Sequence, residues 1–172
     1  MIVVKRADNI ESPDALIARL VQEYQVPLRR MCCIWLKDAA LAEDAVQETF
    51  VKAWRAALSF RGECSEKTWL MRIAINVCRN IRRDAWFRFV DRRITPEQLP
   101  LQSASPEDRA LVETVMNLRY RHREVVLLYY YQGMSLREIS EVLGIAASTI
   151  STRLKKAREK LRHELKGGHG HV

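Results

Sequence analysis

Apolar residues recur three and four positions apart along most of the chain, which is the spacing of one face of an α-helix. In the first half, this spacing predicts helices over residues 14–36, 39–58 and 65–83. Pro27 lies inside the first of these stretches and is expected to bend that helix or to divide it in two. Gly62 marks the break before the third stretch. The first half should therefore fold as three or four packed helices.

The helical pattern fails between residues 86 and 106, where three prolines and a polar run predict a linker. Helices resume with Ser105 as the expected cap, and they cover residues 107–117 and 120–131. The predicted fold class is therefore all-α, with two small helical domains. The predicted boundaries are a first domain of residues 1–85, a flexible linker of 86–105, a second domain of 106–166 and a flexible tail of 167–172.

Residues 134–161 have the pattern of two helices around a tight turn. Ser135 and Glu138 form a capping box that begins the first helix, and Gly144 permits the left-handed backbone of the turn. The second helix should begin near residue 147, with apolar residues on one face and small hydroxyls and cations elsewhere. This pattern is typical of a DNA-binding helix-turn-helix, although an amphipathic hairpin with a solvated basic face shares it.

Charge is unevenly distributed along the 172 residues, which carry a net charge of +8. Residues 72–93 contain seven arginines and two aspartates, and residues 153–166 contain seven Lys or Arg and two glutamates. Residues 38–48 contain four acids and no base. Two basic regions favour a polyanionic partner such as nucleic acid, since cations that neutralise phosphates release counterions.

No sequence motif points to catalysis, a metal or a membrane. A Walker loop, a nucleophile elbow and an HExxH motif are absent, so the chain is not predicted to be an enzyme. The four cysteines form no CxxC pair and the four histidines lack zinc-finger spacing, so neither a metal site nor a cofactor is expected. Without a signal peptide or an apolar run of about 20 residues, the expected location is cytoplasmic, with no membrane insertion.

The stretch AEDAVQETFVKAW, residues 42–54, has two distinct faces when placed on a helix. Its apolar face is expected to lie in the core and comprises Val46, Phe50, Ala53, Trp54 and Ala57. Its other face carries Glu43, Asp44, Gln47 and Glu48. That polar face is either ordinary solvated surface or a docking strip for a basic partner helix, and the residues alone favour neither.

A second candidate site lies in FRGECSEKTWLMRIAINVCRNIRR, residues 60–83. A glycine loop precedes a helix in which arginines and asparagines alternate with apolar residues, a surface that can hold single-stranded DNA and a base pulled from the stack. Trp69 follows the apolar stripe and is expected in the core, where it can still shape such a pocket.

These three blocks, in this order, closely resemble the extracytoplasmic-function (ECF) class of bacterial sigma factors, within the sigma-70 family. The resemblance covers residues 14–165. It implies that the DAVQETF helix docks on the clamp helices of the RNA polymerase β′ subunit and that the protein also contacts the β flap. The polymerase-binding positions it implies are Asp44, Gln47, Glu48 and Phe50.

The resemblance also implies two promoter-binding regions. The positions implied for melting and recognising the minus-ten element are Arg61, Gly62, Asn76, Arg79, Asn80 and Arg83, with Asn80 as the base-contacting amide. Those implied for the minus-thirty-five element are Ser148, Ser151, Thr152, Arg153, Lys156 and Arg158. Ser151 departs from the family, which often has a basic residue there, and this lost cation alters the expected upstream contacts.

The implied partners are core RNA polymerase, promoter DNA and a cognate anti-sigma factor, commonly membrane-tethered. An alternative is a one-component regulator whose helix-turn-helix resembles LuxR-type output domains and whose first domain senses a ligand or dimerises. A symmetric dimer on palindromic DNA would support the regulator, whereas a one-to-one complex with core polymerase would support the sigma factor.

Overall fold

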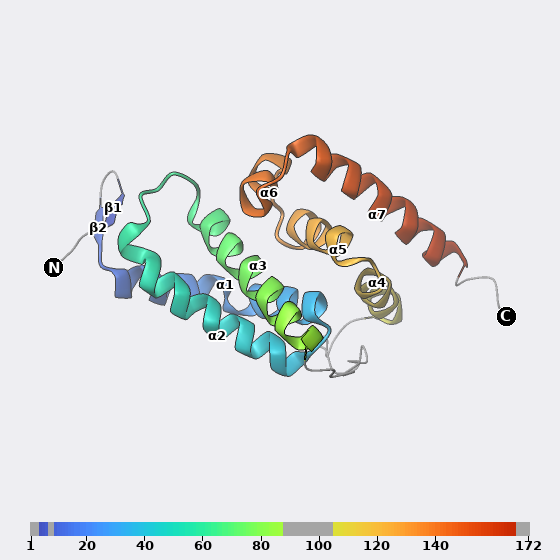
Figure 1. The fold of residues 1–172 in the computed structure, drawn as a ribbon, viewed down its shortest axis with the longest axis horizontal. Helices are drawn as coiled ribbons and strands as arrows, with labels where there is room; N and C mark the ends of the chain where they lie inside the picture. The colour runs from blue at the N-terminus through green and yellow to red at the C-terminus, as the bar shows by residue number, and fades with distance from the viewer. Residues whose placement is uncertain (1–3, 7–8, 88–104, 168–172) are drawn as a thin grey trace.

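The computed structural model describes residues 4–6, 9–87 and 105–167. Its first half is a bundle of three long helices, seen at the lower left of Figure 1, preceded by a short antiparallel hairpin. All three predicted helices are confirmed. The elements of this half are β1 (Val4–Arg6), β2 (Asn9–Glu11), α1 (Pro13–Leu36), α2 (Ala39–Ala56), the 3₁₀ turn η1 (Ala57–Ser59) and α3 (Glu66–Phe87).

The second half packs four helices and a π-helical turn at the upper right of Figure 1. Its elements are α4 (Pro106–Met116), α5 (Tyr120–Val126), the π-helical turn η3 (Leu127–Tyr131), α6 (Leu136–Leu143) and α7 (Ala147–Gly167). The all-α fold class is therefore confirmed, with the hairpin as a small addition. Residues 88–104 of the predicted linker and 168–172 of the predicted tail lie outside the described residues.

Side-chain caps fix where several helices begin. Ser12 accepts a hydrogen bond from the backbone N–H of Ala15 at 3.2 Å and starts α1. The predicted cap at Ser105 is confirmed, and so is the capping box that starts α6, in which Ser135 accepts from the N–H of Glu138 at 3.2 Å. Such caps satisfy backbone donors that have no partner within the helix.

Pro27 does not divide the first helix, because α1 runs unbroken through 24 residues. The proline removes one backbone donor from the helix interior, at a cost of about 3 kcal/mol. Packing on both sides offsets that cost, since Leu20, Leu28 and Met31 are all 0% exposed. Tertiary burial therefore overrides the local preference to end the helix.

Buried apolar residues from both halves form one continuous core. The predicted core face of α2 is confirmed for Val46 and Ala53 but wrong for Trp54, which is 53% exposed. On an α-helix, residue 54 is turned about 80° from residue 46, so its ring falls at the edge of the buried face. The Trp54 indole N–H instead donates to the Asp14 carboxylate at 2.8 Å.

The halves pack directly against each other, and the most extensive contact between them is α3 against α6. The Arg123 guanidinium of α5 crosses this boundary and donates to the Trp35 carbonyl of α1 at 2.6 Å. Burial lowers the pKa of Arg123 to about 10, so the group remains charged at neutral pH. No helix in the described ranges is both long and apolar enough to cross a membrane.

The turn between α6 and α7 depends on Gly144, whose φ is 66°. A Cβ atom here would meet nothing within 4 Å, so substitution is opposed only by the left-handed backbone. We expect Gly144→Ala to lower the free energy of unfolding by about 1 kcal/mol, measured by denaturant titration. Gly144→Asn should recover part of that loss because asparagine tolerates this conformation, and equal stability of all three chains would contradict this account.

Candidate functional site

The polar face of α2 is exposed to solvent. Asp44, Gln47 and Glu48, which we call the acidic strip, are all exposed, whereas Phe50 is half-buried and packs against the core. Glu48 pairs with Lys52 at 3.0 Å along the same helix. Three of the four predicted polymerase-binding positions therefore form an exposed surface, whereas Phe50 belongs to the side of α2 that packs against the core.

Large apolar side chains extend the acidic strip along α2. Val51, Trp54 and Leu58 are 42%, 53% and 49% exposed. Helical geometry places residue 51 within about 20° of the centre of the exposed acidic face, and Leu58 follows in η1, directly after α2. Neighbouring exposed apolar side chains beside a charged strip are typical of a protein-docking surface. This apolar extension was not predicted from the sequence, although Val51 lies one turn after Gln47.

The loop before α3 is built around a turn and an aromatic stack. Gly62 has a φ of 73°, and both Arg61 and Gly62 are exposed. Phe60 stacks on Trp69 with ring centroids 4.7 Å apart. Trp69 is half-buried against the core, so it both packs inward and supports the loop, as the sequence suggested.

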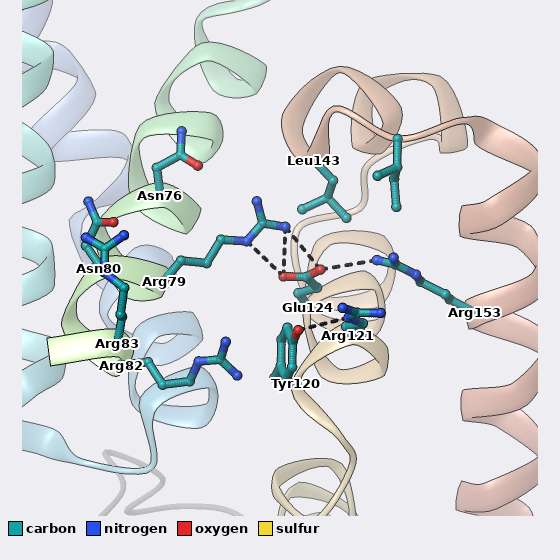
Figure 2. A pocket seen from close by; sticks show the side chains of 11 residues that line it. Asn76, Arg79, Asn80, Arg82, Arg83, Tyr120, Arg121, Glu124, Leu143 and Arg153 are labelled. Carbon is teal, nitrogen blue, oxygen red and sulfur yellow. Dashed lines mark hydrogen bonds and ion pairs between the residues drawn. The ribbon is translucent and has the colours of Figure 1, made fainter. Parts of the chain in front are cut away.

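The predicted minus-ten residues of α3 lie along a cleft of about 1130 Å³ between the two halves. Asn76, Asn80 and Arg83 are exposed there, and the side chains of α5 and α7 face them from the other half (Figure 2). Arg61 and Gly62 are not among the residues that line this cleft. The helix and its preceding loop therefore form two separate parts of the predicted surface.

A single buried carboxylate joins two of the predicted DNA-binding arginines. Glu124 is 1% exposed, and it accepts hydrogen bonds from Arg79 of α3 at 3.1 Å and from Arg153 of α7 at 3.4 Å, as Figure 2 shows. Burial raises the pKa of Glu124, and the positive charge of Arg79 opposes that rise. The role of Glu124 was not predicted from the sequence, because nothing in its neighbouring residues distinguishes it from a surface glutamate.

The exposed face of α7 forms a second hollow, of about 780 Å³. The predicted residues that line it are Ser148, Thr152, Arg153 and Lys156. Ser151 is exposed but lies outside this hollow. Arg158 is also exposed, and it borders an apolar groove of about 520 Å³ on the other side of the helix. The predicted minus-thirty-five residues therefore occupy two sides of α7.

The start of α5 contributes two more arginines and a histidine to the hollow beside α7. Arg119, Arg121 and His122 line it together with the predicted residues. Burial, followed by the charges of nearby arginines and lysines, lowers the pKa of His122. Sequence analysis did not select these three residues, although the run RYRHR at residues 119–123 was the available signal. A concave surface with this many cations suits phosphates.

Family models match both halves of the chain. The sigma-70 region 2 model matches residues 20–88, and the sigma-70 region 4 model matches residues 116–163. These matches cover more than half of the chain. The chain belongs to the sigma-70 family. The acidic strip and the α3 face lie in region 2, and α6 and α7 lie in region 4.

Curated relatives place this sigma factor in the ECF class. It is 36% identical over 156 residues to the ECF RNA polymerase sigma factor SigL of Mycobacterium tuberculosis, a match that covers 86% of this chain and 88% of that one. It is 28% identical over 183 residues to the ECF RNA polymerase sigma factor SigW of Bacillus subtilis, covering 96% and 98% of the two chains.

Two solved structures resemble this sigma factor in fold. One is the sigma factor RpoE from Bartonella quintana in complex with the anti-sigma factor NepR, with a TM-score of 0.75, 26% identity and coverage of 86% of this chain and 97% of that chain. The other is CnrH in complex with the cytosolic domain of CnrY, with a TM-score of 0.69, 29% identity and coverage of 88% of each chain.

The cysteines of this sigma factor are free thiols. Cys32 of α1 and Cys78 of α3 are both 0% exposed, and their sulfur atoms lie 3.6 Å apart. The Cys78 contact and burial raise the pKa of Cys32, which keeps it a thiol. Among the described residues, no group of three or more potential metal ligands comes together. Cys32 and Cys78 therefore act as core side chains.

Proposed function

We propose that this ECF sigma factor binds core RNA polymerase through α2 and directs it to specific promoters, so that its own role in the cytoplasm is binding while polymerase performs the chemistry. The observation that carries this proposal is the exposed face of α2. Acids and large apolar side chains share that face, and it lies apart from both arginine-rich hollows. Such separation allows one chain to bind a protein and DNA at the same time.

The two basic surfaces suit two different promoter elements. The α3 face offers amides beside arginines, as needed to hold an unpaired base while its phosphates are neutralised. The α7 face offers hydroxyls and a lysine on an exposed helix, as needed in the major groove of duplex DNA. We assign the minus-ten element to α3 with the loop at Arg61 and Gly62, and the minus-thirty-five element to α7.

The proposed domain boundaries follow the same division. We assign residues 1–85 to the polymerase-docking and minus-ten domain and residues 106–166 to the minus-thirty-five domain, with α3 continuing to Phe87 and α7 to Gly167. A linker of residues 86–105 joins them, and residues 167–172 form a tail. The β flap is assigned as the second polymerase contact on the strength of the family resemblance.

A cognate anti-sigma factor is part of the proposal. The RpoE structure that resembles this chain contains the anti-sigma factor NepR, and the CnrH structure contains the cytosolic domain of CnrY. We propose that a corresponding partner covers the polymerase- and DNA-binding surfaces of this chain. The one-component regulator is the weaker candidate, because the first half matches sigma-70 region 2.

Binding to core enzyme tests the proposed function. Purified chain mixed with core polymerase should co-elute in size-exclusion chromatography as a complex of one sigma chain to one core enzyme. Failure to co-elute, together with a stable dimer of the chain on palindromic DNA, would favour the regulator.

Substituting Lys156 should change affinity for upstream DNA but leave sequence preference unchanged. Lys156 is exposed in the α7 hollow and is positioned for a phosphate. In holoenzyme, Lys156→Ala should weaken initial promoter binding and reduce the slope of log affinity against log salt by about 1. Lys160→Ala is the control, since Lys160 pairs with Glu164 outside the hollow. An altered base preference in Lys156→Ala would contradict the phosphate assignment.

A further inference from the structure

One titratable residue lies among the cations of the hollow beside α7. Of the described residues that line this hollow, only His122 has an ordinary pKa close to neutral pH. We propose that His122 is a DNA-phosphate contact that gains a proton when duplex DNA enters the hollow, so that upstream promoter binding strengthens as the pH falls. This inference rests on the proposed function and deepens it, because it treats the α7 face as the surface that binds the minus-thirty-five element.

The fold places His122 beside the amino-terminal end of α7. His122 lies in the first turn of α5, where its backbone N–H donates to the Arg119 carbonyl at 2.9 Å. Ser148 and Thr149, from the start of α7, line the same hollow. When a recognition helix enters the major groove, its first residues reach base edges, while the surface around it meets the phosphates that flank the groove. We therefore expect His122 to meet a phosphate and not a base.

The charges that act on His122 come from two helices and are positive. They belong to Arg119 at the start of α5 and to Arg153, Lys156 and Lys160 of α7. Burial first, and then these cations, lower the pKa of His122, because both disfavour a further positive charge. At neutral pH, the unbound chain therefore carries a neutral imidazole in an otherwise cationic hollow.

The carboxylate that follows His122 along α5 is already neutralised. Glu124 is 1% exposed. It pairs with Arg79 at 3.1 Å and with Arg153 at 3.4 Å, as Figure 2 shows. Among the described residues that line the hollow, none carries a carboxylate, and Glu159 is exposed on α7 outside it. A DNA phosphate would therefore bring to His122 a negative charge that these lining residues do not supply.

Phosphates in the hollow reverse the electrostatic balance at His122. Duplex DNA carries one negative charge for about every 1.7 Å of its axis, so DNA seated on α7 brings phosphates against the cations of the hollow. A negative charge close to an imidazole favours the protonated ring and raises its pKa. Protonated imidazole has two N–H donors, and one of them can donate to a phosphate oxygen in a charge-assisted hydrogen bond.

Proton uptake by His122 links the affinity for DNA to pH. The pKa of His122 is lower in the unbound chain than in the complex, so the complex binds more protons between those two pKa values. Affinity therefore rises as the pH falls through the pKa of the complex, and the gain is complete below the pKa of the unbound chain. Each unit by which DNA raises this pKa strengthens binding by up to about tenfold. Arginine contacts keep their charge over this range and add no such dependence.

The test follows the His122 ring and the affinity for DNA in the full-length chain. NMR signals of the imidazole, assigned through the backbone, give the pKa of His122 with and without a short DNA duplex of mixed sequence. Fluorescence anisotropy gives the affinity for the same duplex, labelled, between about pH 8 and about pH 6 at constant ionic strength. His122→Asn removes the titratable ring. His163→Asn is the matched control, because His163 is exposed on α7 and does not line the hollow. Circular dichroism establishes that each chain is folded.

We expect the duplex to raise the pKa of His122. The affinity of the unsubstituted chain and of His163→Asn should increase about three- to tenfold over this fall in pH, whereas that of His122→Asn should stay constant. An unchanged pKa of His122 in the complex would overturn the proposal. Undiminished pH dependence in His122→Asn would also overturn it, as would the absence of duplex binding throughout the pH range. If His122→Asn fails to fold, the two pKa values measured in the unsubstituted chain decide.

Run-off transcription with the unsubstituted chain separates this proposal from the proposed function. New transcripts together with an unchanged pKa of His122 would reject proton uptake alone. A raised pKa of His122 on DNA, in a chain that neither binds core polymerase nor directs transcription, would instead reject the proposed function.

Discussion

Reversing the charge of the acidic strip with Asp44→Lys and Glu48→Lys is expected to abolish binding to core RNA polymerase while the chain remains folded. Both carboxylates are exposed on α2. Like charges brought together at an interface cost several kcal/mol, and about 3 kcal/mol already corresponds to a loss of about 100-fold in affinity. Co-elution with core enzyme and a titration of labelled sigma factor measure this loss.

The free energy of unfolding should change little in the chain that carries Asp44→Lys and Glu48→Lys. Asp44 is exposed, and Glu48 loses its ion pair with Lys52, in which both side chains are about half exposed. Such exposed pairs, four residues apart on a helix, contribute about 0.3–0.5 kcal/mol. The matched control is Glu113→Lys with Glu159→Lys, which reverses two exposed charges in the other half of the molecule. Equal affinities of the two variants for core polymerase would contradict the docking assignment.

Removing the Asn80 amide is expected to impair promoter opening by about tenfold or more, because an amide that pairs with a base contributes about 1–3 kcal/mol of recognition. Asn80 is exposed on α3 and lines the central cleft, so truncation leaves the core intact. In holoenzyme carrying Asn80→Ala, closed complexes should form at close to the normal rate. Permanganate reactivity of unpaired thymines measures the opening step separately.

Two comparisons make this prediction specific to the minus-ten region. Gln25→Ala removes an exposed amide from α1 and should leave opening unchanged. Lys156→Ala should instead weaken the closed complex through the upstream element. If Asn80→Ala and Lys156→Ala showed the same defect, the division of labour between α3 and α7 would be wrong.

Local patterns sufficed to predict most of the fold. The caps at Ser105 and Ser135 and the turn at Gly144 depend on interactions within a few residues, so sequence spacing identifies them. The spacing of apolar residues also predicted the buried face of α7. Ile150, Leu154 and Ala157 are all buried, as that spacing predicts. Of the two alternatives predicted for Pro27, division of the helix is wrong, because the packing that holds α1 together comes from other helices.

Features that depend on tertiary contacts could not be predicted. The pairing of Arg79 with Glu124 joins residues 45 positions apart, and no periodicity reports such a contact. Trp54 was placed in the core because its spacing fits the apolar face, but the packed bundle covers only part of that face. The sequence therefore identified the candidate DNA-binding residues. It could not indicate that two of them are held by one buried carboxylate.

Run-off transcription tests the central claim most directly. Core RNA polymerase would be assayed with and without this chain on promoter fragments from its host genome. The proposed function predicts discrete new transcripts that require the chain and that share two upstream sequence elements when aligned. A chain that is folded and binds DNA, yet produces no new transcript and does not bind core enzyme, would contradict its assignment as a sigma factor.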